Sequence, residues 1–201
     1  MRVKFFSCYS IGLNENIPSR YIVANFAKWK QLPCYDYSLK QGFYQQINHM
    51  TQNQAQSLLE KLQALDHLTG KALQEAVVQL LDQEVEYYNW TGFYFMNDEA
   101  QQLEIGPYVG AYTDHTIIPY GRGICGQVAV SGKTFEVPDV HSQDNYLACS
   151  LETKSEIVVP MYKGEVLVGQ LDIDSHKLDP FTAEDHEVLN SVVEFVAARL
   201  D

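Results

Sequence analysis

The chain has 201 residues, enough for one sizeable domain or for one domain with an extension. Hydrophobic residues make up 46% and charged residues 20%, a balance that predicts a packed core and excludes a disordered chain. The formal net charge of -12 predicts a surface that repels nucleic-acid phosphates and anionic lipid, so we expect neither a nucleic-acid nor a membrane partner.

The first 50 residues differ from the rest of the chain. They are rich in aromatic side chains and irregular in pattern, so we expect residues 1–50 to be an extension of unknown role before a domain over 51–201. The opening MRVKFF has the basic start of a signal peptide, but SCYSIGLNENIP after it is too short and too polar for the apolar region. We therefore expect a cytoplasmic protein.

Helical patterns begin at Thr51. Leucines and valines recur at helical spacing through residues 51–85, with a break at Gly70, which predicts two helices or one interrupted helix. Near the end of the chain, Thr182 and Asp185 have the spacing of a capping box, and an apolar stripe follows them. This pattern predicts a C-terminal helix.

Strand patterns fill the space between these helices. Two pairs of β-rich runs are each joined by a turn and predict two hairpins, and two shorter extended segments lie between them. The ranges are 87–96 with 103–110, then 115–121 and 134–138, then 155–162 with 166–175. Helices at both ends with antiparallel hairpins between them predict an α+β domain, a sheet with helices packed on a face.

The segment from Gly121 to Gly126 matches the G-x-G-x-x-G pattern of dinucleotide-binding folds. That fingerprint requires a strand before it and a long helix after it. Here the chain has room for only about two helical turns before Gly132. We therefore favour a tight backbone turn around Cys125 over a nucleotide site.

Asp172 and Asp174 lie two residues apart on a predicted strand, so both carboxylates point to the same face. Like charges repel there unless a cation or a proton lies between them. A metal ion, with Asp139 and His141 as further ligands, and the ammonium group of a small molecule are both open interpretations. The remaining one is a solvent-facing edge whose other face buries the neighbouring apolar residues.

The four cysteines are Cys8, Cys34, Cys125 and Cys149, and no two of them have CxxC spacing. This excludes a zinc ribbon, and a disulfide scaffold is not expected at this length. Cys125 lies in the glycine-rich turn and Cys149 in a polar loop, outside any β-branched core run. Cys149 is open to three interpretations: structural residue, metal ligand or reactive thiol.

Aromatic residues gather in the first predicted strand. Trp90, Gly92 and Tyr94 share one face of it and either line a ligand pocket or fill a core, the second interpretation being favoured from the sequence.

Taken together, five segments resemble the free methionine-R-sulfoxide reductases, which are single GAF domains. The match runs from about Trp90 to Asp185, with unusually specific motifs in nearly unchanged spacing. The segments are NWTGFYF, IGPYVG, IPYGRGICGQVAVSGKTFEVPDVH, LACSLETKSEIVVP and VGQLDIDS. The resemblance implies a GAF-like antiparallel sheet with helices on either side.

The resemblance also implies a thiol mechanism. The cysteine that matches Cys149 attacks the sulfur of free methionine sulfoxide, leaving a sulfenic acid that a second cysteine converts to a disulfide. A thioredoxin-like reductant then restores the thiols, without cofactor or metal. The carboxylates that match Glu156, Asp172 and Asp174 hold the substrate's ammonium and sulfoxide oxygen. The positions of Trp90 and Tyr94 match aromatics at its methyl end.

The sequence departs from the family at two places. A resolving cysteine ordinarily lies four residues before the proline of the Ile-Pro pair, where this chain has His115. The family motif His-Ile-Ala-Cys-Asp is Tyr-Leu-Ala-Cys-Ser here, so Tyr146 and Ser150 replace its His and Asp. We therefore expect Cys125 to act as the resolving thiol, with Cys8 or Cys34 as the alternative. A GAF module that binds a small molecule without turnover is the competing function, and a homodimer stays open.

Overall fold

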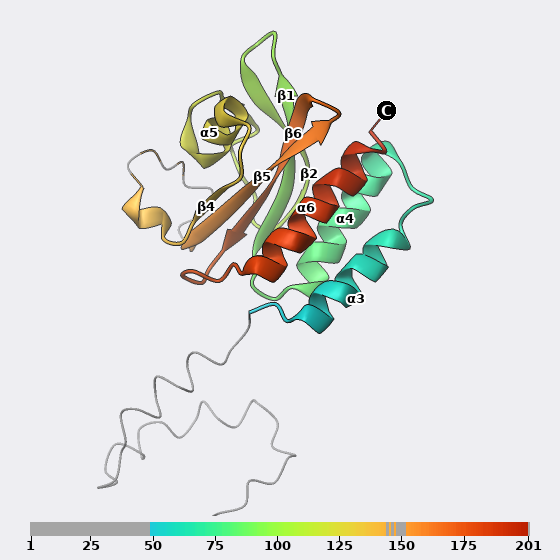
Figure 1. Ribbon diagram of the computed structural model, residues 1–201. Coiled ribbons are helices and arrows are strands. Elements are labelled where there is room, and N and C mark those ends of the chain that lie inside the picture. Colours follow the sequence, from blue (N-terminus) through green and yellow to red (C-terminus); the bar gives the residue numbers. More distant parts are fainter. Residues whose placement is uncertain (1–48, 144, 146, 148–151, 201) are drawn as a thin grey trace, which may run out of the picture. The chain divides into compact units, whose positions relative to one another are not determined.

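The computed structural model describes residues 49–143, 145, 147 and 152–200 (Figure 1). The predicted extension over 1–50, with Cys8 and Cys34, lies outside the described residues apart from His49 and Met50. Cys149, Tyr146 and Ser150 lie outside them too. No helix within the described ranges is long and apolar enough to cross a membrane.

An antiparallel sheet of six strands, in the order β3-β2-β1-β6-β5-β4, organises the described chain. Both predicted hairpins are confirmed, as β1–β2 and β5–β6, and pairing of β1 with β6 joins them. The strands are β1 Trp90–Asn97, β2 Gln102–Val109, β3 Ile117–Pro119, β4 Phe135–Val137, β5 Ser155–Lys163 and β6 Val166–Ser175. The β1–β6 contact brings segments about 80 residues apart in sequence to the centre of the sheet.

Three helices cover one face of this sheet, as Figure 1 shows: α3 (Gln52–Gln63), α4 (Gly70–Glu84) and α6 (Ala183–Ala197). The apolar stripes of α4 and α6 pack on the inward-facing strand residues, and α3 packs on these two helices. Together they form the larger hydrophobic core. The predicted break in the first helical region is confirmed, because α3 ends at Gln63 and α4 begins at Gly70, whose φ is 54°. Glycine adopts that left-handed conformation without a side-chain clash.

The predicted capping box at the C-terminal helix is confirmed. The side chain of Asp185 accepts hydrogen bonds from the backbone N–H of Thr182 at 2.8 Å and from its hydroxyl at 2.7 Å. These contacts satisfy a backbone donor that the helix itself leaves without a partner, and so set where α6 begins.

The other face of the sheet carries α5 (Gly123–Ser131) and the short 3-10 turn η3 (Val140–Ser142) (Figure 1). A second hydrophobic core lies between α5 and the sheet. Strand alternation assigns β6 residues to the two faces: Leu171 and Ile173 join the larger core, while Asp172 and Asp174 point toward α5. The predicted α+β fold class, an antiparallel sheet with helices packed on it, is thereby confirmed.

Candidate functional site

Three carboxylates are buried together on the α5 side of the sheet. Asp172 and Asp174 point to this side from β6, and Glu156 on β5 lies directly opposite Asp174 in the strand register. The exposed fraction of each side chain is 4% or less. The alternative of a solvent-facing edge is therefore wrong, because the sheet face that carries these acids is covered by α5 and the surrounding chain.

The side chain of Cys125, on α5, contacts this cluster. It lies in the first turn of α5, and its thiol donates a hydrogen bond to Oδ2 of Asp172 at 3.2 Å. One ligand-type atom each from Cys125, Glu156 and Asp172 lies within 4.8 Å of the other two. The structure thus places the thiol of Cys125 beside two of the carboxylates to which the family resemblance gives a role in substrate binding.

Crowding and burial shift the acidity of this cluster. Burial raises the pKa of Asp172 to about 7, and the hydrogen bond from Cys125 offsets part of that rise. Burial and the neighbouring charges of Asp172 and Asp174 raise the pKa of Glu156 well above its ordinary range. Acids in this state keep protons near neutral pH and can donate hydrogen bonds to an oxygen acceptor.

Asp174 shows the same behaviour. Burial, followed by the charge of Asp172, raises its pKa well above the ordinary range. The nearby hydroxyl of Thr153 offsets part of this rise in the pKa of Asp174. The hydroxyl and the carboxyl group nevertheless lie outside hydrogen-bonding geometry. Both oxygens of Asp174 and Oδ1 of Asp172 are buried with no hydrogen-bond partner among the described residues. Buried polar atoms without a partner are rare and indicate that a ligand or water completes the site.

The glycine-rich turn forms the backbone that presents Cys125. Gly121 and Gly123 have φ values of 81° and 65°. A Cβ atom on Gly126 would lie 2.7 Å from the carbonyl oxygen of Pro119 and 3.0 Å from the nitrogen of Gly121. The tight-turn interpretation is therefore confirmed: the glycines allow a close backbone approach and start a helix of only nine residues.

The chain before Cys149 is attached to this same turn. The side chain of Asn145 accepts a hydrogen bond from the N–H of Gly123 at 3.2 Å and donates one to the carbonyl of Gly121 at 3.0 Å. A Cβ on Gly123 would lie 2.9 Å from Cβ of Leu147, so the two backbones are in close contact. Asn145 and Leu147, four and two residues before Cys149, therefore dock on the start of α5.

Aromatic rings form one wall beside the carboxylates. Trp90 lies opposite Asp174 in the β1–β6 register and stacks on Tyr108, with ring centroids 5.3 Å apart. Tyr94 is also stacked on Trp90, at 6.2 Å. Both belong to the second hydrophobic core, so the core interpretation is confirmed for these rings. They also adjoin the acidic cluster, a position the sequence left open.

His115 is part of the chain segment that lies against this aromatic wall. Its carbonyl oxygen accepts a hydrogen bond from the hydroxyl of Tyr94 at 3.0 Å, and its N–H donates to Oγ1 of Thr113 at 3.1 Å. The indole N–H of Trp90 donates to the carbonyl of Ala111 at 3.2 Å. The aromatic side chains therefore hold the backbone of residues 111–115 in place.

Two polar residues of this region were not identified from the sequence. Gln170 is fully buried on β6, on the same face as Asp172, and neither polar atom of its amide has a hydrogen-bond partner among the described residues. The two-residue alternation that aligns Asp172 with Asp174 extends to Gln170 and could have identified it. Asn145 carried no comparable signal, because its contacts depend on the fold of a turn about 24 residues away.

The structure does not support a metal site that combines Asp139 and His141 with the buried aspartates. Asp139 and His141 are not part of the cluster: Oδ1 of Asp139 accepts the backbone N–H of His141 at 3.0 Å within the exposed turn at η3. The only group of potential metal ligands found in the described part of the chain is Cys125, Glu156 and Asp172. Its ligand set is therefore one sulfur and two oxygens.

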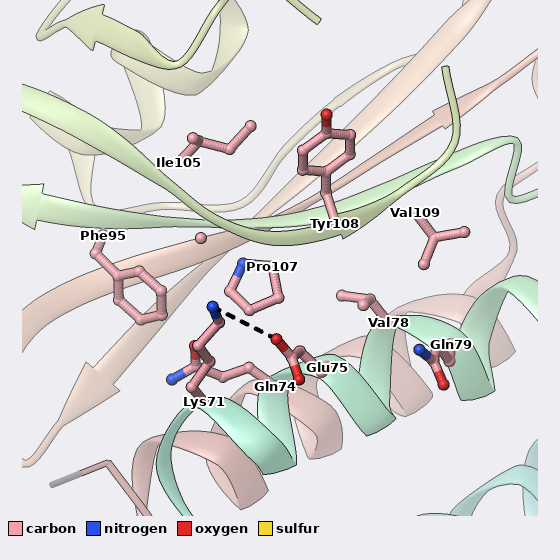
Figure 2. Close-up of a pocket in the computed structure, with 11 residues that line it drawn as sticks. Lys71, Gln74, Glu75, Val78, Gln79, Phe95, Ile105, Pro107, Tyr108 and Val109 are labelled. Carbon is pink, nitrogen blue, oxygen red and sulfur yellow. Dashed lines mark ion pairs between the residues drawn. The ribbon is translucent and has the colours of Figure 1, made fainter. Parts of the chain in front are cut away.

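A separate groove of about 670 Å³ lies on the other side of the sheet, between α4 and β2. Figure 2 shows Phe95, Pro107 and Val109 facing α4, with the Lys71–Glu75 ion pair of 3.6 Å beside them. Tyr108 points to the opposite side. None of the predicted site residues lines this groove. Its size alone therefore does not make it the functional site.

Comparisons with known proteins agree with this architecture. The family model described as a GAF domain matches residues 64–201. GAF domain-containing protein A of Dictyostelium discoideum is 36% identical over 149 residues, covering 72% of this chain and 91% of that protein. The free methionine-R-sulfoxide reductase of Escherichia coli is 37% identical over 114 residues, or 57% of this chain and 67% of that one.

Among solved structures, the free methionine-R-sulfoxide reductase of Neisseria meningitidis in complex with its substrate is similar to this chain at 29% identity and a TM-score of 0.67. The match covers 76% of this chain and 93% of that one. The chain therefore belongs to the GAF-domain family, in the group that includes the free methionine-R-sulfoxide reductases.

Proposed function

We propose that the chain reduces free methionine-R-sulfoxide to methionine by thiol chemistry. The observation that carries this proposal is the buried cluster in which the Cys125 thiol meets the carboxylates of Glu156 and Asp172. Relatives named for this reaction, at 36–37% identity, support the substrate class. The non-catalytic GAF module remains the competing function.

The carboxylates would bind and activate the substrate. An acid that keeps its proton at neutral pH can donate it toward the sulfoxide oxygen, which makes the sulfur more electrophilic. An ionised neighbour can pair with the substrate's ammonium group. The raised pKa values of Glu156, Asp172 and Asp174 support such a division between protonated and ionised acids. Trp90 and Tyr94 supply apolar contact for the methyl end.

Cys149 would be the nucleophile. Its sulfur attacks the sulfoxide sulfur, and the oxygen then transfers from that sulfur to the sulfur of Cys149 as the methionine sulfur–oxygen bond breaks. Methionine departs, and Cys149 is left as a sulfenic acid whose oxygen carries the former thiol proton. The thiol of Cys125 then condenses with this sulfenic acid, forming a disulfide and releasing water. A dithiol protein of the thioredoxin type reduces the disulfide by exchange and is itself oxidised. Electrons pass only between sulfur atoms, so no cofactor is needed.

The docked segment before Cys149 supports Cys125 as the resolving thiol. A disulfide requires the two Cα atoms to come within about 7 Å. Leu147 contacts the start of α5, and two residues span at most about 7 Å. Cys125 is the third residue of that helix. This short tether favours Cys125 over Cys8 and Cys34.

The deciding experiment is turnover of the separate R and S epimers of free methionine sulfoxide with a thioredoxin-coupled readout. We expect turnover of the R epimer alone, none with Cys149→Ser, and one equivalent of methionine per chain with Cys125→Ser. Glu165→Gln, in the exposed β5–β6 turn, is the matched control and should match the unmutated protein. Absence of R-epimer turnover combined with calorimetric binding of the compound would instead favour the binding module.

Mass spectrometry after one oxidising cycle identifies the disulfide. A Cys125–Cys149 linkage is expected. A linkage from Cys149 to Cys8 or Cys34 would transfer the resolving role to the N-terminal segment.

A further inference from the structure

One sulfur and two oxygen ligand atoms meet on the α5 side of the sheet. The ligand atoms of Cys125, Glu156 and Asp172 all lie within 4.8 Å of one another. A tetrahedral zinc site, with a Zn–S bond of about 2.3 Å and Zn–O bonds of about 2.1 Å, separates sulfur from oxygen by about 3.6 Å. Sγ of Cys125 and Oδ2 of Asp172 are 3.2 Å apart. A cation between the three groups therefore requires movements of only about 1 Å.

Partnerless oxygens point independently to a missing ligand. Oδ1 of Asp172 and both oxygens of Asp174 are buried and accept no hydrogen bond from any described residue. Burial of such oxygens without compensation is costly. Asp174 faces Glu156 across the β5–β6 register, so its carboxyl group can supply a fourth ligand or accept a hydrogen bond from a metal-bound water.

The local charge favours a cation. The ion pairs found in the described part of the chain include none of the three carboxylates. A divalent ion that displaces the protons of these buried acids would compensate the carboxylate charges that form. The sulfur ligand selects within this class, since thiolates prefer Zn²⁺, Co²⁺ and Cd²⁺ while Mg²⁺ and Ca²⁺ prefer all-oxygen sites.

We propose that Cys125, Glu156 and Asp172 bind a thiophilic divalent cation, and that this cation blocks the reductase site. Binding is ligand exchange: the metal–sulfur bond forms, water leaves the metal, and the thiol and carboxyl protons pass to solvent without any change of oxidation state. Affinity should therefore rise with pH. A metal-held Cys125 cannot condense with a sulfenic acid, and the cation occupies the place of the substrate's ammonium. This blocking role rests on the function proposed above.

Cobalt provides a direct spectroscopic test. Co²⁺ is added without air to the reduced, chelator-treated full chain while the near-ultraviolet thiolate-to-cobalt band is recorded. We expect saturation at one Co²⁺ per chain in the unmutated protein. The same band, with a Kd within about threefold, is expected in the variant Cys8→Ser/Cys34→Ser/Cys149→Ser, which keeps Cys125 as its single thiol.

Substitutions of the ligands complete the assignment. Cys125→Ser should lose the band, and Glu156→Gln should weaken Co²⁺ binding at least about tenfold while retaining it. Glu165→Gln, the matched carboxylate-to-amide change in an exposed turn, should bind like the unmutated protein. Absence of the band in the single-thiol variant, or an unchanged Kd in Glu156→Gln, would overturn the proposed site. Circular dichroism of each variant verifies folding.

Competition separates this proposal from the proposed function. With methionine sulfoxide at ten times its own Kd, a shared site raises the apparent Kd for Co²⁺ about 11-fold. An unchanged Kd would refute the blocking role. Loss of the reductase proposal alone would leave the band intact in a protein without turnover. Loss of the cation site alone would leave turnover of metal-free protein intact and abolish the band.

Discussion

The thiol of Cys125 donates a 3.2 Å hydrogen bond to Oδ2 of Asp172, and this contact joins α5 to the central strand β6. Burial raises the pKa of Asp172 from 3.8 to about 7, partly offset by this bond. Between about pH 4 and pH 7, the folded chain therefore holds a proton on Asp172 that the unfolded chain has already released. A raised carboxyl pKa destabilises the folded state as pH increases through this window.

Asp172→Asn should remove this pH-dependent cost. Asparagine keeps an oxygen acceptor for Cys125 but cannot ionise. For an acid with a pKa of 3.8 unfolded and about 7 folded, the cost grows by roughly 3 kcal/mol between pH 5 and pH 8. Urea unfolding at the two pH values should show Asp172→Asn gaining about this much relative to the unmutated protein. The exposed Asp66→Asn control should not gain, and a constant difference for Asp172→Asn would contradict the prediction.

Gly126→Ala should disrupt the turn that presents Cys125. The added Cβ would lie 2.7 Å from the carbonyl oxygen of Pro119, and this backbone atom cannot rotate away. We expect a loss of roughly 2–4 kcal/mol in the free energy of unfolding, together with reduced reductase turnover. Gly164→Ala is the control: its φ is 66° but nothing lies within 4 Å, so it should lose only about 1 kcal/mol. Equal losses in the two variants would refute the steric argument.

Local patterns predicted much of this fold. Alternation along one predicted strand assigned Asp172 and Asp174 to one face, and the Thr182–Asp185 spacing predicted where a helix begins. These features depend on residues at most a few positions apart, which the chain's own periodicity determines. The inward-facing sides of the strands and the ends of the helices could therefore be predicted from the sequence.

Contacts between residues far apart in the sequence could not be predicted from local patterns. Cys125 and Asp172 are 47 residues apart, and no periodicity links a helix residue to the strand beneath it. The family resemblance indicated that they belong to one site, but it did not predict their hydrogen bond. The burial of Gln170 likewise depends on α5 covering the sheet. Tertiary packing determines such contacts, and a single sequence does not encode them locally.

Asp185 connects the start of α6 to the segment between α4 and β1 through a second pair of contacts. Its Oδ1 accepts hydrogen bonds from the hydroxyls of Tyr87 at 2.6 Å and Tyr88 at 2.8 Å, while Oδ2 holds the Thr182 cap. Burial, reinforced by Asp185, raises the pKa of both tyrosines well above the ordinary range. Asp185→Ala leaves several buried donors without an acceptor, so the protein should lose about 3–5 kcal/mol in urea unfolding.

The neighbouring Glu184→Ala is the matched control in the same helical turn. Glu184 is half-buried and accepts a 2.9 Å hydrogen bond from the exposed side chain of Gln52, so its removal should shift the urea midpoint much less than Asp185→Ala does. A similar shift in both variants would mean that the charge at the helix start, not the buried network, is responsible.

The buried amide of Gln170 leads to a prediction of opposite sign. Neither of its polar atoms has a hydrogen-bond partner among the described residues, although its exposed fraction is 0%. Gln170→Met keeps the side-chain length and removes this desolvation cost, so the free energy of unfolding should increase by about 1 kcal/mol. Gln127→Met is the control, because that amide donates to the carbonyl of Gly123 at 3.0 Å and the variant should lose stability. A loss of more than about 1 kcal/mol in Gln170→Met would instead show that a buried water or ligand is bound to the amide.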